Sequence, residues 1–417
     1  MILSGISHKE DTKQRILTIA AVLLSVIYFF VAAGRFSGSV FGIYFSTGYD
    51  AFKLIPLPWL FWIYYRYKYD ERPWNAPALL VSFITLFLIT LVAGVASPDS
   101  WQALADSLEI LFYIGLFVML VDFPWNERLL KIVAAGFLIG NLYLISVVFQ
   151  QYFSADYTSG LIRVSGTFTH PNTLGPYCIF GMTLLLWLAG NLRNRTDLIW
   201  TWICIGGLFV ALLLCQSRTT LIGLVVWLGV VYWYGNPRAR KIIIGFVVLA
   251  FVLSLLLTPQ VYGRFFSLFG EIQESSGVNR ILIWSGIMQS EMPTLSPFGV
   301  GMGPVATVRF GDWIASSPEG PPLARAWGSH NAYLAWLVGT GLMGMCCLLW
   351  LFSSALRRLR DCDQYNKGIL SAGIIALLVI CLYQDPLLSS NIPIVWITML
   401  AIIDRIMIDR EKGENLE

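Results

Sequence analysis

Apolar runs alternate with short polar segments along almost the whole of this 417-residue chain. Most runs are close to the twenty or so residues that an α-helix needs to cross about 30 Å of hydrocarbon. The pattern predicts twelve membrane-spanning helices, at residues 16–33, 47–65, 76–96, 108–121, 132–152, 173–190, 199–215, 219–234, 242–257, 331–352, 369–384 and 392–408. The second run is the least regular, because Asp50, Lys53 and two prolines interrupt it.

The fold expected from this pattern is all-α, a polytopic membrane protein in which residues 1–417 form one integral membrane domain. The one long polar segment, residues 258–330, joins the ninth and tenth predicted helices. Within it, "NRILIWSGIMQSEM" repeats apolar residues at helical spacing, which predicts an amphipathic helix on the membrane surface. The next stretch, "SPFGVGMGP", is rich in glycine and proline and is typical of a loop.

Composition narrows the class of protein further. With 57% hydrophobic and 13% charged residues, the chain is too apolar for one soluble core. A net charge of +3 spread over short loops makes nucleic acid an unexpected partner. The sequence has no GxxxxGK[ST] phosphate loop, HExxH or CxxC motif, and no Asp-x-Asp pair in a predicted external loop. No cofactor or metal is therefore expected.

Positive charge is divided unevenly between the two sets of alternate loops, which predicts that both termini are cytoplasmic. Of the 28 lysines and arginines, only eight fall on the opposite face: Arg35, Lys53, Arg163, Arg218, Arg264, Arg280, Arg309 and Arg325. Seven of these eight are arginine, the preferred ligand for a bound polyanion. Simple solubility of the long loop is the alternative for Arg264, Arg309 and Arg325, and the sequence does not decide between the two.

A histidine directly precedes an apolar run in "GSHNAYLAWLVGTGLMG", residues 328–344. In one interpretation Ser329 or Asn331 caps a helix and His330 is incidental. In the other, the positive end of the helix dipole disfavours the charged imidazole, so that His330 stays neutral and can act as a general base. The glycines of this run, at 339, 341 and 344, are expected to allow close helix packing.

Arg218 lies between two apolar runs in "LLLCQSRTTLIGLVV", with Gln216 and Ser217 as its polar neighbours. An ionised group at this depth is costly and indicates a functional site, although snorkelling of the side chain to the headgroups is the alternative.

Two further external segments carry candidates. In "GLIRVSGTFTHPNTLGPY", Arg163 either belongs to a simple loop or contacts the substrate. The position of His170 favours a structural role for it over a catalytic one. Asn172 or Thr173 of the same segment could cap the sixth helix. In "SSGVNRILIW", Arg280 enters the amphipathic run, where free amides and a guanidinium would together favour an anion.

Four features together resemble the O-antigen ligase and polymerase superfamily. They are the twelve predicted spans with one large late loop, "QSRTT" opening the eighth span, "NR" opening the amphipathic run, and "SHNAYL" entering the tenth span. The similarity extends from about Arg163 to the last predicted span, whereas the segment before it shares only the pattern of spans.

The resemblance implies a GT-C-like membrane glycosyltransferase of the bacterial inner membrane, with its active face and its large loop, residues 258–330, in the periplasm. It implies an undecaprenyl-pyrophosphate glycan as donor, membrane lipids as surroundings, and neither metal nor nucleotide. Carried over by motif, Arg218 and Arg280, with Arg163, would bind the pyrophosphate. His330 would take the proton from the acceptor hydroxyl as this attacks the anomeric carbon with inversion. Asn331, His170, Asn172 and Gln216 are secondary candidates.

The acceptor stays open at this point. An O-antigen ligase transfers the glycan to the lipid A core in lipopolysaccharide biosynthesis, whereas an O-antigen or exopolysaccharide polymerase transfers it to another lipid-linked glycan. Chain length and span pattern favour the ligase. From a different class, a polytopic transporter or lipid flippase is the main rival. Against it, the two halves show no repeat, and the predicted charges gather at one face.

Overall fold

The computed structural model describes residues 2–33, 36–40, 43–47, 51–74, 77–97, 100–155, 163–237, 240–241, 244–248, 284–288, 297–301, 330–387 and 392–413. These residues are almost wholly helical. The departure from the all-α expectation is an antiparallel hairpin of β1 (Phe36–Val40) and β2 (Ile43–Thr47), paired from Phe36 with Thr47 to Val40 with Ile43. Its sequence, "FSGSVFGIYFST", is rich in β-branched and aromatic residues and too short to span a bilayer.

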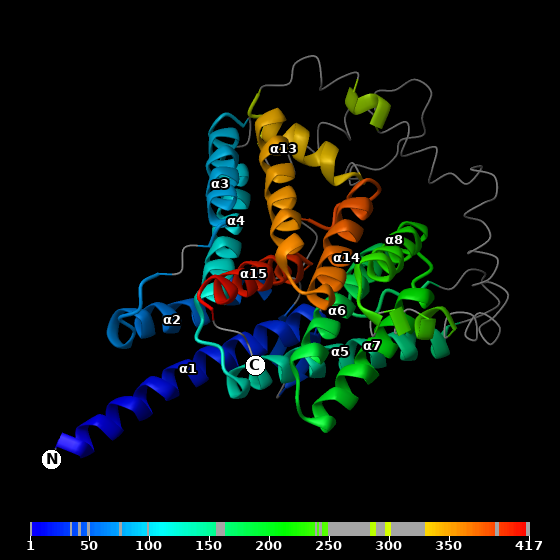
Figure 1. Ribbon diagram of the computed structural model, residues 1–417. Coiled ribbons are helices and arrows are strands. Elements are labelled where there is room, and N and C mark those ends of the chain that lie inside the picture. Colours follow the sequence, from blue (N-terminus) through cyan, green and yellow to red (C-terminus); the bar gives the residue numbers. More distant parts are fainter. Residues whose placement is uncertain are drawn as a thin grey trace. The chain divides into compact units, whose positions relative to one another are not determined.

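Figure 1 shows the helices in chain order. They are α1 (Ile2–Ala33), η1 (Ala51–Leu54), α2 (Pro56–Tyr69), α3 (Leu80–Val95), α4 (Ser100–Asp122), α5 (Glu127–Ser154), α6 (Pro171–Asn191), α7 (Arg195–Leu214), α8 (Arg218–Tyr234), α13 (Ala332–Arg358), η4 (Leu359–Asp361), α14 (Gln364–Cys381) and α15 (Ile392–Glu411).

Seven of the described helices, α1, α4, α5, α6, α7, α13 and α14, are long and apolar enough to cross a membrane, and α3 and α8 are shorter apolar helices. The chain is thus a multi-pass membrane protein. The total of twelve spans stays a prediction, because most of the ninth run, residues 242–257, lies outside the described residues. The second run, expected at residues 47–65, is instead the short helix α2, which begins at Pro56. Proline is favoured in the first turn of a helix, and Pro56 and Pro58 lie at the beginning of α2.

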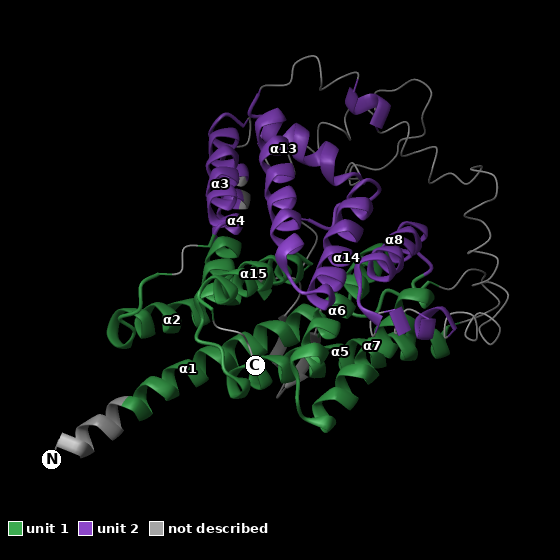
Figure 2. Cartoon of the chain, viewed as in Figure 1, with its two compact units in different colours: residues 1–77, 112–215, 390–417 green, residues 78–111, 216–389 purple. Residues whose placement is uncertain are grey.

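The chain divides into two compact units that are interleaved in sequence (Figure 2). Unit 1 comprises residues 1–77, 112–215 and 390–417, and unit 2 comprises residues 78–111 and 216–389. The expectation of one integral domain over the whole chain stays a prediction.

In unit 1, α1 and α5 approach each other closely because α5 carries two glycines one turn apart. A Cβ at Gly140 would lie 2.6 Å from the carbonyl oxygen of Phe29, and one at Gly136 would overlap the carbonyl of Ser25. Small residues at this spacing let helix backbones approach in a bilayer. A buried polar contact joins α5 to α6, since the Tyr177 hydroxyl donates to Asn141 Oδ1 at 3.0 Å.

A buried ion network ties the end of α2 to the end of α4, also within unit 1. Arg66 Nη1 lies 2.8 Å from Asp70 Oδ2, and Arg66 Nε lies 3.2 Å from Asp122 Oδ2. Arg72 closes the network with Nη2 at 2.7 Å from Asp70. Burial alone would raise the pKa of the Asp70 carboxyl, but hydrogen bonds from Arg72 and Arg66 outweigh it and hold this pKa well below its usual range.

We predict that Asp70→Asn lowers stability by roughly 1–3 kcal/mol, because it removes charge-assisted hydrogen bonds from two arginines. A depressed pKa in the folded state contributes stability that is present above the unfolded value of about 3.9 and lost as pH falls through the folded value. Melting curves of detergent-solubilised protein should therefore show the same deficit at pH 5 and pH 8 and a smaller one below about pH 4. A deficit that grows on acidification would contradict this account.

In unit 2, α13 is broken at Gly341, whose backbone (φ 66, ψ −170) is non-helical. Residues 297–301 supply the hydrogen bonds that the break removes. Val300 and Gly301 donate to the carbonyls of Val338 and Gly339 at 2.9 and 3.0 Å, and Met343 donates to the carbonyl of Pro297 at 3.2 Å. Unpaired backbone groups are costly in a bilayer, so a break is tolerated where another segment satisfies them. Close packing does occur at Gly341, but its partner is the backbone of residues 297–301 and not another helix, and this glycine interrupts α13.

Gly341→Ala should destabilise the protein by more than about 2 kcal/mol, because this backbone region is essentially restricted to glycine and an added Cβ would overlap the carbonyl of Pro297. The matched control is Gly229→Ala in α8, where a Cβ meets nothing within 4 Å. The control should leave the melting temperature unchanged or raise it slightly. Equal melting temperatures for the two variants would contradict the description of the break.

Candidate functional site

The start of α8 is an unusual helix entry. Gln216, two residues before Arg218, has a left-handed backbone (φ 50) and is buried. Ser217 is the N-cap residue, yet its side chain does not cap the helix. Arg218 is the first helical residue and is half-buried. Left-handed conformations of non-glycine residues cost energy and are found most often at functional sites.

The start of α13 has the same form. His330 also has a left-handed backbone (φ 48), and it precedes the N-cap residue Asn331. Asn331 Oδ1 accepts a hydrogen bond from the amide of Leu334 at 3.1 Å, as the capping interpretation predicted for this residue. Gln216 and His330 are the two non-glycine residues with positive φ in the described part of the chain. Both therefore occupy the position before an N-cap at the entry of an apolar helix.

One residue joins the two helix entries. Gln384 follows α14 and is buried, with 6% of its surface exposed. Its side-chain Nε2 donates to Ser217 Oγ at 3.3 Å, and its backbone carbonyl accepts from the amide of Ala332, the first residue of α13, at 3.1 Å. The turn after α14, residues 382–385, which we name the Gln384 turn, therefore holds the entries of α8 and α13 together within unit 2.

The amphipathic run reaches the same turn. Residues 284–288 are helical, and the ring of Trp284 lies 6.3 Å from that of Tyr383, the neighbour of Gln384. Arg280 itself lies outside the described residues, as do Arg264, Arg309 and Arg325. The described part of the run nevertheless places three separate sequence motifs at one turn.

Two buried polar atoms at the α8 entry make no hydrogen bond to any described residue. They are Gln216 Oε1 and Thr220 Oγ1. Buried polar atoms are nearly always satisfied in folded proteins, so each exception calls for a ligand, a water molecule or a functional reason. The first-turn amides of α8 point toward the same entry, where the helix dipole favours an anion.

Arg163 and Asn172 form a separate cluster in unit 1. Arg163 Nη2 donates to Asn172 Oδ1 at 2.8 Å, and Arg163 Nε donates to the carbonyl of Cys215 at 3.4 Å. This carbonyl ends α7 and precedes Gln216. Arg163 thus contacts the residue that leads into the α8 entry.

His170 caps α6, in place of the expected Asn172 or Thr173. Its Nδ1 accepts a hydrogen bond from the amide of Asn172 at 3.1 Å. The geometry gives His170 a structural role, which is the role its sequence context favoured.

Gln384 is the residue that the sequence analysis missed. A local signal exists, since "YQDP" places two polar residues and a proline directly after the eleventh predicted span, on the face that carries Arg218 and His330. Arginine and histidine stand out at a span end because they carry charge or a titratable proton, whereas a neutral amide such as Gln384 does not.

The family model described as O-Antigen ligase matches residues 203–349. This segment, about a third of the chain, is similar to the O-antigen ligase family. The match confirms the resemblance to the O-antigen ligase and polymerase superfamily. It includes Gln216, Arg218, Arg280, His330 and Asn331 and therefore both helix entries, whereas Arg163 and Gln384 fall outside it. No curated protein matches the chain.

We predict that Ser217 and Gln384 are energetically coupled. Each of Ser217→Ala and Gln384→Ala should cost about 1 kcal/mol, and the double variant should cost less than the sum, because both remove the same buried hydrogen bond. Melting curves of the four proteins measure the coupling. Gln364→Ala, at the exposed opposite end of α14, is the matched control. Its effect and that of Ser217→Ala should be additive. Additive effects of Ser217→Ala and Gln384→Ala would contradict the geometry of the Gln384 turn.

Proposed function

We propose that this protein is a membrane glycosyltransferase that transfers a glycan from an undecaprenyl-pyrophosphate donor, and specifically an O-antigen ligase whose acceptor is the lipid A core. The observation that carries the proposal is the Gln384 turn, which brings the entry of Arg218 and the entry of His330 together within a segment that matches the O-antigen ligase family. The proposed setting is the bacterial inner membrane, with the site facing the periplasm.

The α8 entry would bind the pyrophosphate of the donor. Arg218 supplies a permanent positive charge and a planar set of donors that match phosphate oxygens. The first-turn amides of α8 add donors in a fixed direction. Arg280 would add a second guanidinium, and Arg163, through Cys215, would fix the residue that precedes this entry. Charge that develops on the leaving pyrophosphate is stabilised by donors that are already oriented.

The α13 entry would provide the base. In the transfer step the acceptor hydroxyl oxygen attacks the anomeric carbon, the bond from this carbon to the phosphate oxygen breaks, and undecaprenyl pyrophosphate leaves with the electron pair. His330 accepts the hydroxyl proton. Attack opposite to the leaving group inverts the anomeric configuration. Asn331 holds the backbone beside the imidazole because its side chain caps α13.

The polymerase alternative uses the same donor and the same residues and differs in the acceptor. Deleting the gene and separating the cell's glycolipids on a gel tells them apart. Lipid A core without O-chain, next to long chains still on the carrier, identifies a ligase. A single attached repeat identifies a polymerase.

One feature of the structure is compatible with a transporter: α13 is broken at Gly341, and transporters often contain discontinuous membrane helices. In transporters the freed backbone groups bind substrate or ions. At Gly341 they pair with residues 297–301 instead. The break therefore does not supply a second candidate function.

For purified protein with a synthetic polyprenyl-pyrophosphate glycan and a lipid A core acceptor, we predict that His330→Ala and Arg218→Ala each reduce transfer at least about 10²-fold. Arg218→Lys should also be impaired, because lysine keeps the charge and loses the planar donor geometry.

Two matched controls accompany these variants. Arg195→Ala changes the exposed arginine that begins α7, as Arg218 begins α8, and His170→Ala changes the histidine that caps α6. Both should retain transfer, and His170→Ala should lose about 1 kcal/mol of stability. Near wild-type transfer by folded His330→Ala or Arg218→Ala protein would remove that residue from its proposed role. Absence of transfer by the wild-type protein with every acceptor would overturn the proposal.

A further inference from the structure

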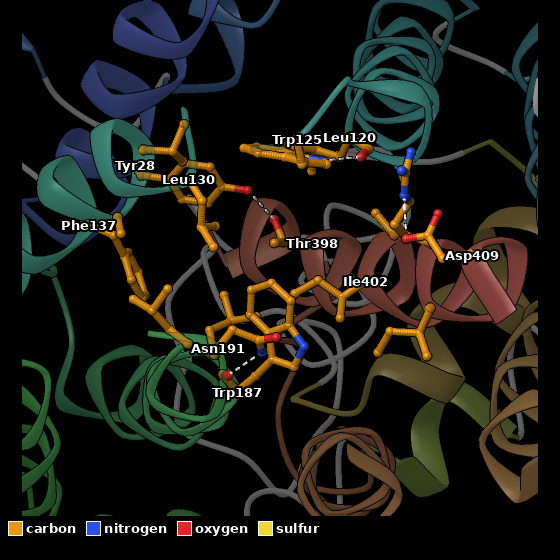
Figure 3. A pocket seen from close by; sticks show the side chains of 17 residues that line it. Tyr28, Leu120, Trp125, Leu130, Phe137, Trp187, Asn191, Thr398, Ile402 and Asp409 are labelled. Carbon is orange, nitrogen blue, oxygen red and sulfur yellow. Dashed lines mark hydrogen bonds and ion pairs between the residues drawn. The ribbon is translucent and has the colours of Figure 1, made fainter. Parts of the chain in front are cut away.

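Unit 1 contains a cavity of about 180 Å³ among α1, α4, α5, α6 and α15 (Figure 3). Its walls are mainly apolar and include Leu130 and Phe137 of α5, Leu184 of α6, and Ala401 and Ile402 of α15. The residues of the Gln384 turn and of the two helix entries are not among its lining residues. The cavity is therefore distinct from the site of the proposed reaction.

One end of the cavity lies beside the ends of two helices of membrane-spanning length. Asn191 is the last residue of α6, and Trp125 comes shortly before the start of α5, and both helices are long enough to cross the membrane. Tryptophans are enriched where membrane and water meet, and Trp125 and Trp187 both line the cavity. The ends of two spanning helices therefore mark this end of the cavity as interfacial.

Charged groups of α15 lie at that interfacial end. Arg405 Nε lies 2.8 Å from Asp409 Oδ2, and Arg405 Nη1 donates to the carbonyl of Val121 at 3.1 Å. Asp409 is 4% exposed, and its second oxygen, Oδ1, makes no hydrogen bond to any described residue. A buried carboxylate oxygen without a donor is costly, so Asp409 Oδ1 favours an occupant of this end of the cavity that donates hydrogen bonds, whether a water molecule or a ligand group.

At the other end of the cavity, the polar groups already have hydrogen-bond partners. The Tyr28 hydroxyl and Thr398 Oγ1 lie 2.6 Å apart and satisfy each other (Figure 3). From Thr398 to Asp409 the cavity follows about 16 Å of helix, at 1.5 Å of rise per residue. This length is about half of the 30 Å hydrocarbon core, which is the depth of one leaflet. An apolar cavity of this shape suits a hydrocarbon chain better than water.

We propose that this cavity binds one acyl chain of a bilayer phospholipid whose headgroup carries a primary ammonium. The ammonium donates to Asp409 Oδ1, and the phosphate lies beside the Arg405 guanidinium. An ammonium offers three N–H donors, whereas a quaternary headgroup of the same charge offers none. Because Asp409 already neutralises Arg405, the paired charges complement a zwitterionic headgroup better than a purely anionic one.

The test compares phosphatidylethanolamine with phosphatidylcholine of identical acyl chains, since the two differ in the N–H donors alone. The full-length protein is equilibrated with an equal mixture of both, washed with detergent, and the retained lipid is counted by native mass spectrometry. The wild-type protein should retain one phosphatidylethanolamine per chain and prefer it about tenfold. Asp409→Asn should bring the preference close to one, because the amide lacks the charge that holds the ammonium.

Asp404→Asn is the matched control, on the same helix but not among the cavity's lining residues, and should keep the preference. Ala401→Phe fills the cavity and should abolish retention of both lipids in protein that still elutes as one species. Three results would overturn the proposal: equal retention of the two lipids by the wild type, an unchanged preference in Asp409→Asn, or undiminished retention in folded Ala401→Phe. If Ala401→Phe does not fold, the Asp409→Asn comparison decides alone.

Discussion

The backbone hydrogen bonds of the first part of α13, residues 332–340, set the geometry on which the candidate site depends. At its beginning, the amide of Ala332 donates to the carbonyl of Gln384. At its end, the carbonyls of Val338 and Gly339 accept from Val300 and Gly301. Inside a bilayer these backbone groups have no water to pair with, so the loss of either set of hydrogen bonds would be costly. This part of α13 is therefore held at both ends by other parts of the chain, and His330 directly precedes it.

The two units handle polar groups by different means. Unit 1 neutralises charge with charge, in the network of Arg66, Asp70 and Asp122 and in the pair of Arg405 and Asp409. Unit 2 pairs backbone groups across a helix break and leaves Gln216 Oε1 without a partner among the described residues. Ion pairs of this kind stabilise a fold, whereas a strained helix entry with a buried polar atom that lacks a partner is found most often at functional sites.

The sequence predicted the spanning helices well wherever the signal is local. Apolar runs of membrane length placed α5, α6 and α7 close to their observed bounds, and Asn331 was one of the two residues considered as a cap of α13. The sequence could not predict the break at Gly341, because the residues that pair with the interrupted backbone groups lie about forty positions earlier in the chain. It likewise missed Gln384, whose hydrogen-bond partner Ser217 is 167 positions away. Long-range pairing of polar groups leaves little trace in a hydrophobicity pattern.

The break at Gly341 also bears on how the protein responds to the thickness of its membrane. A continuous helix of this length adjusts to a thicker or thinner bilayer by tilting as one rod. Because α13 is interrupted, its longer part can tilt while residues 332–340 stay attached to the Gln384 turn and to residues 297–301. The position of His330 relative to Arg218 then becomes insensitive to hydrophobic mismatch. In the proposed transfer reaction, the two helix entries would then keep their relative positions in bilayers of different thickness.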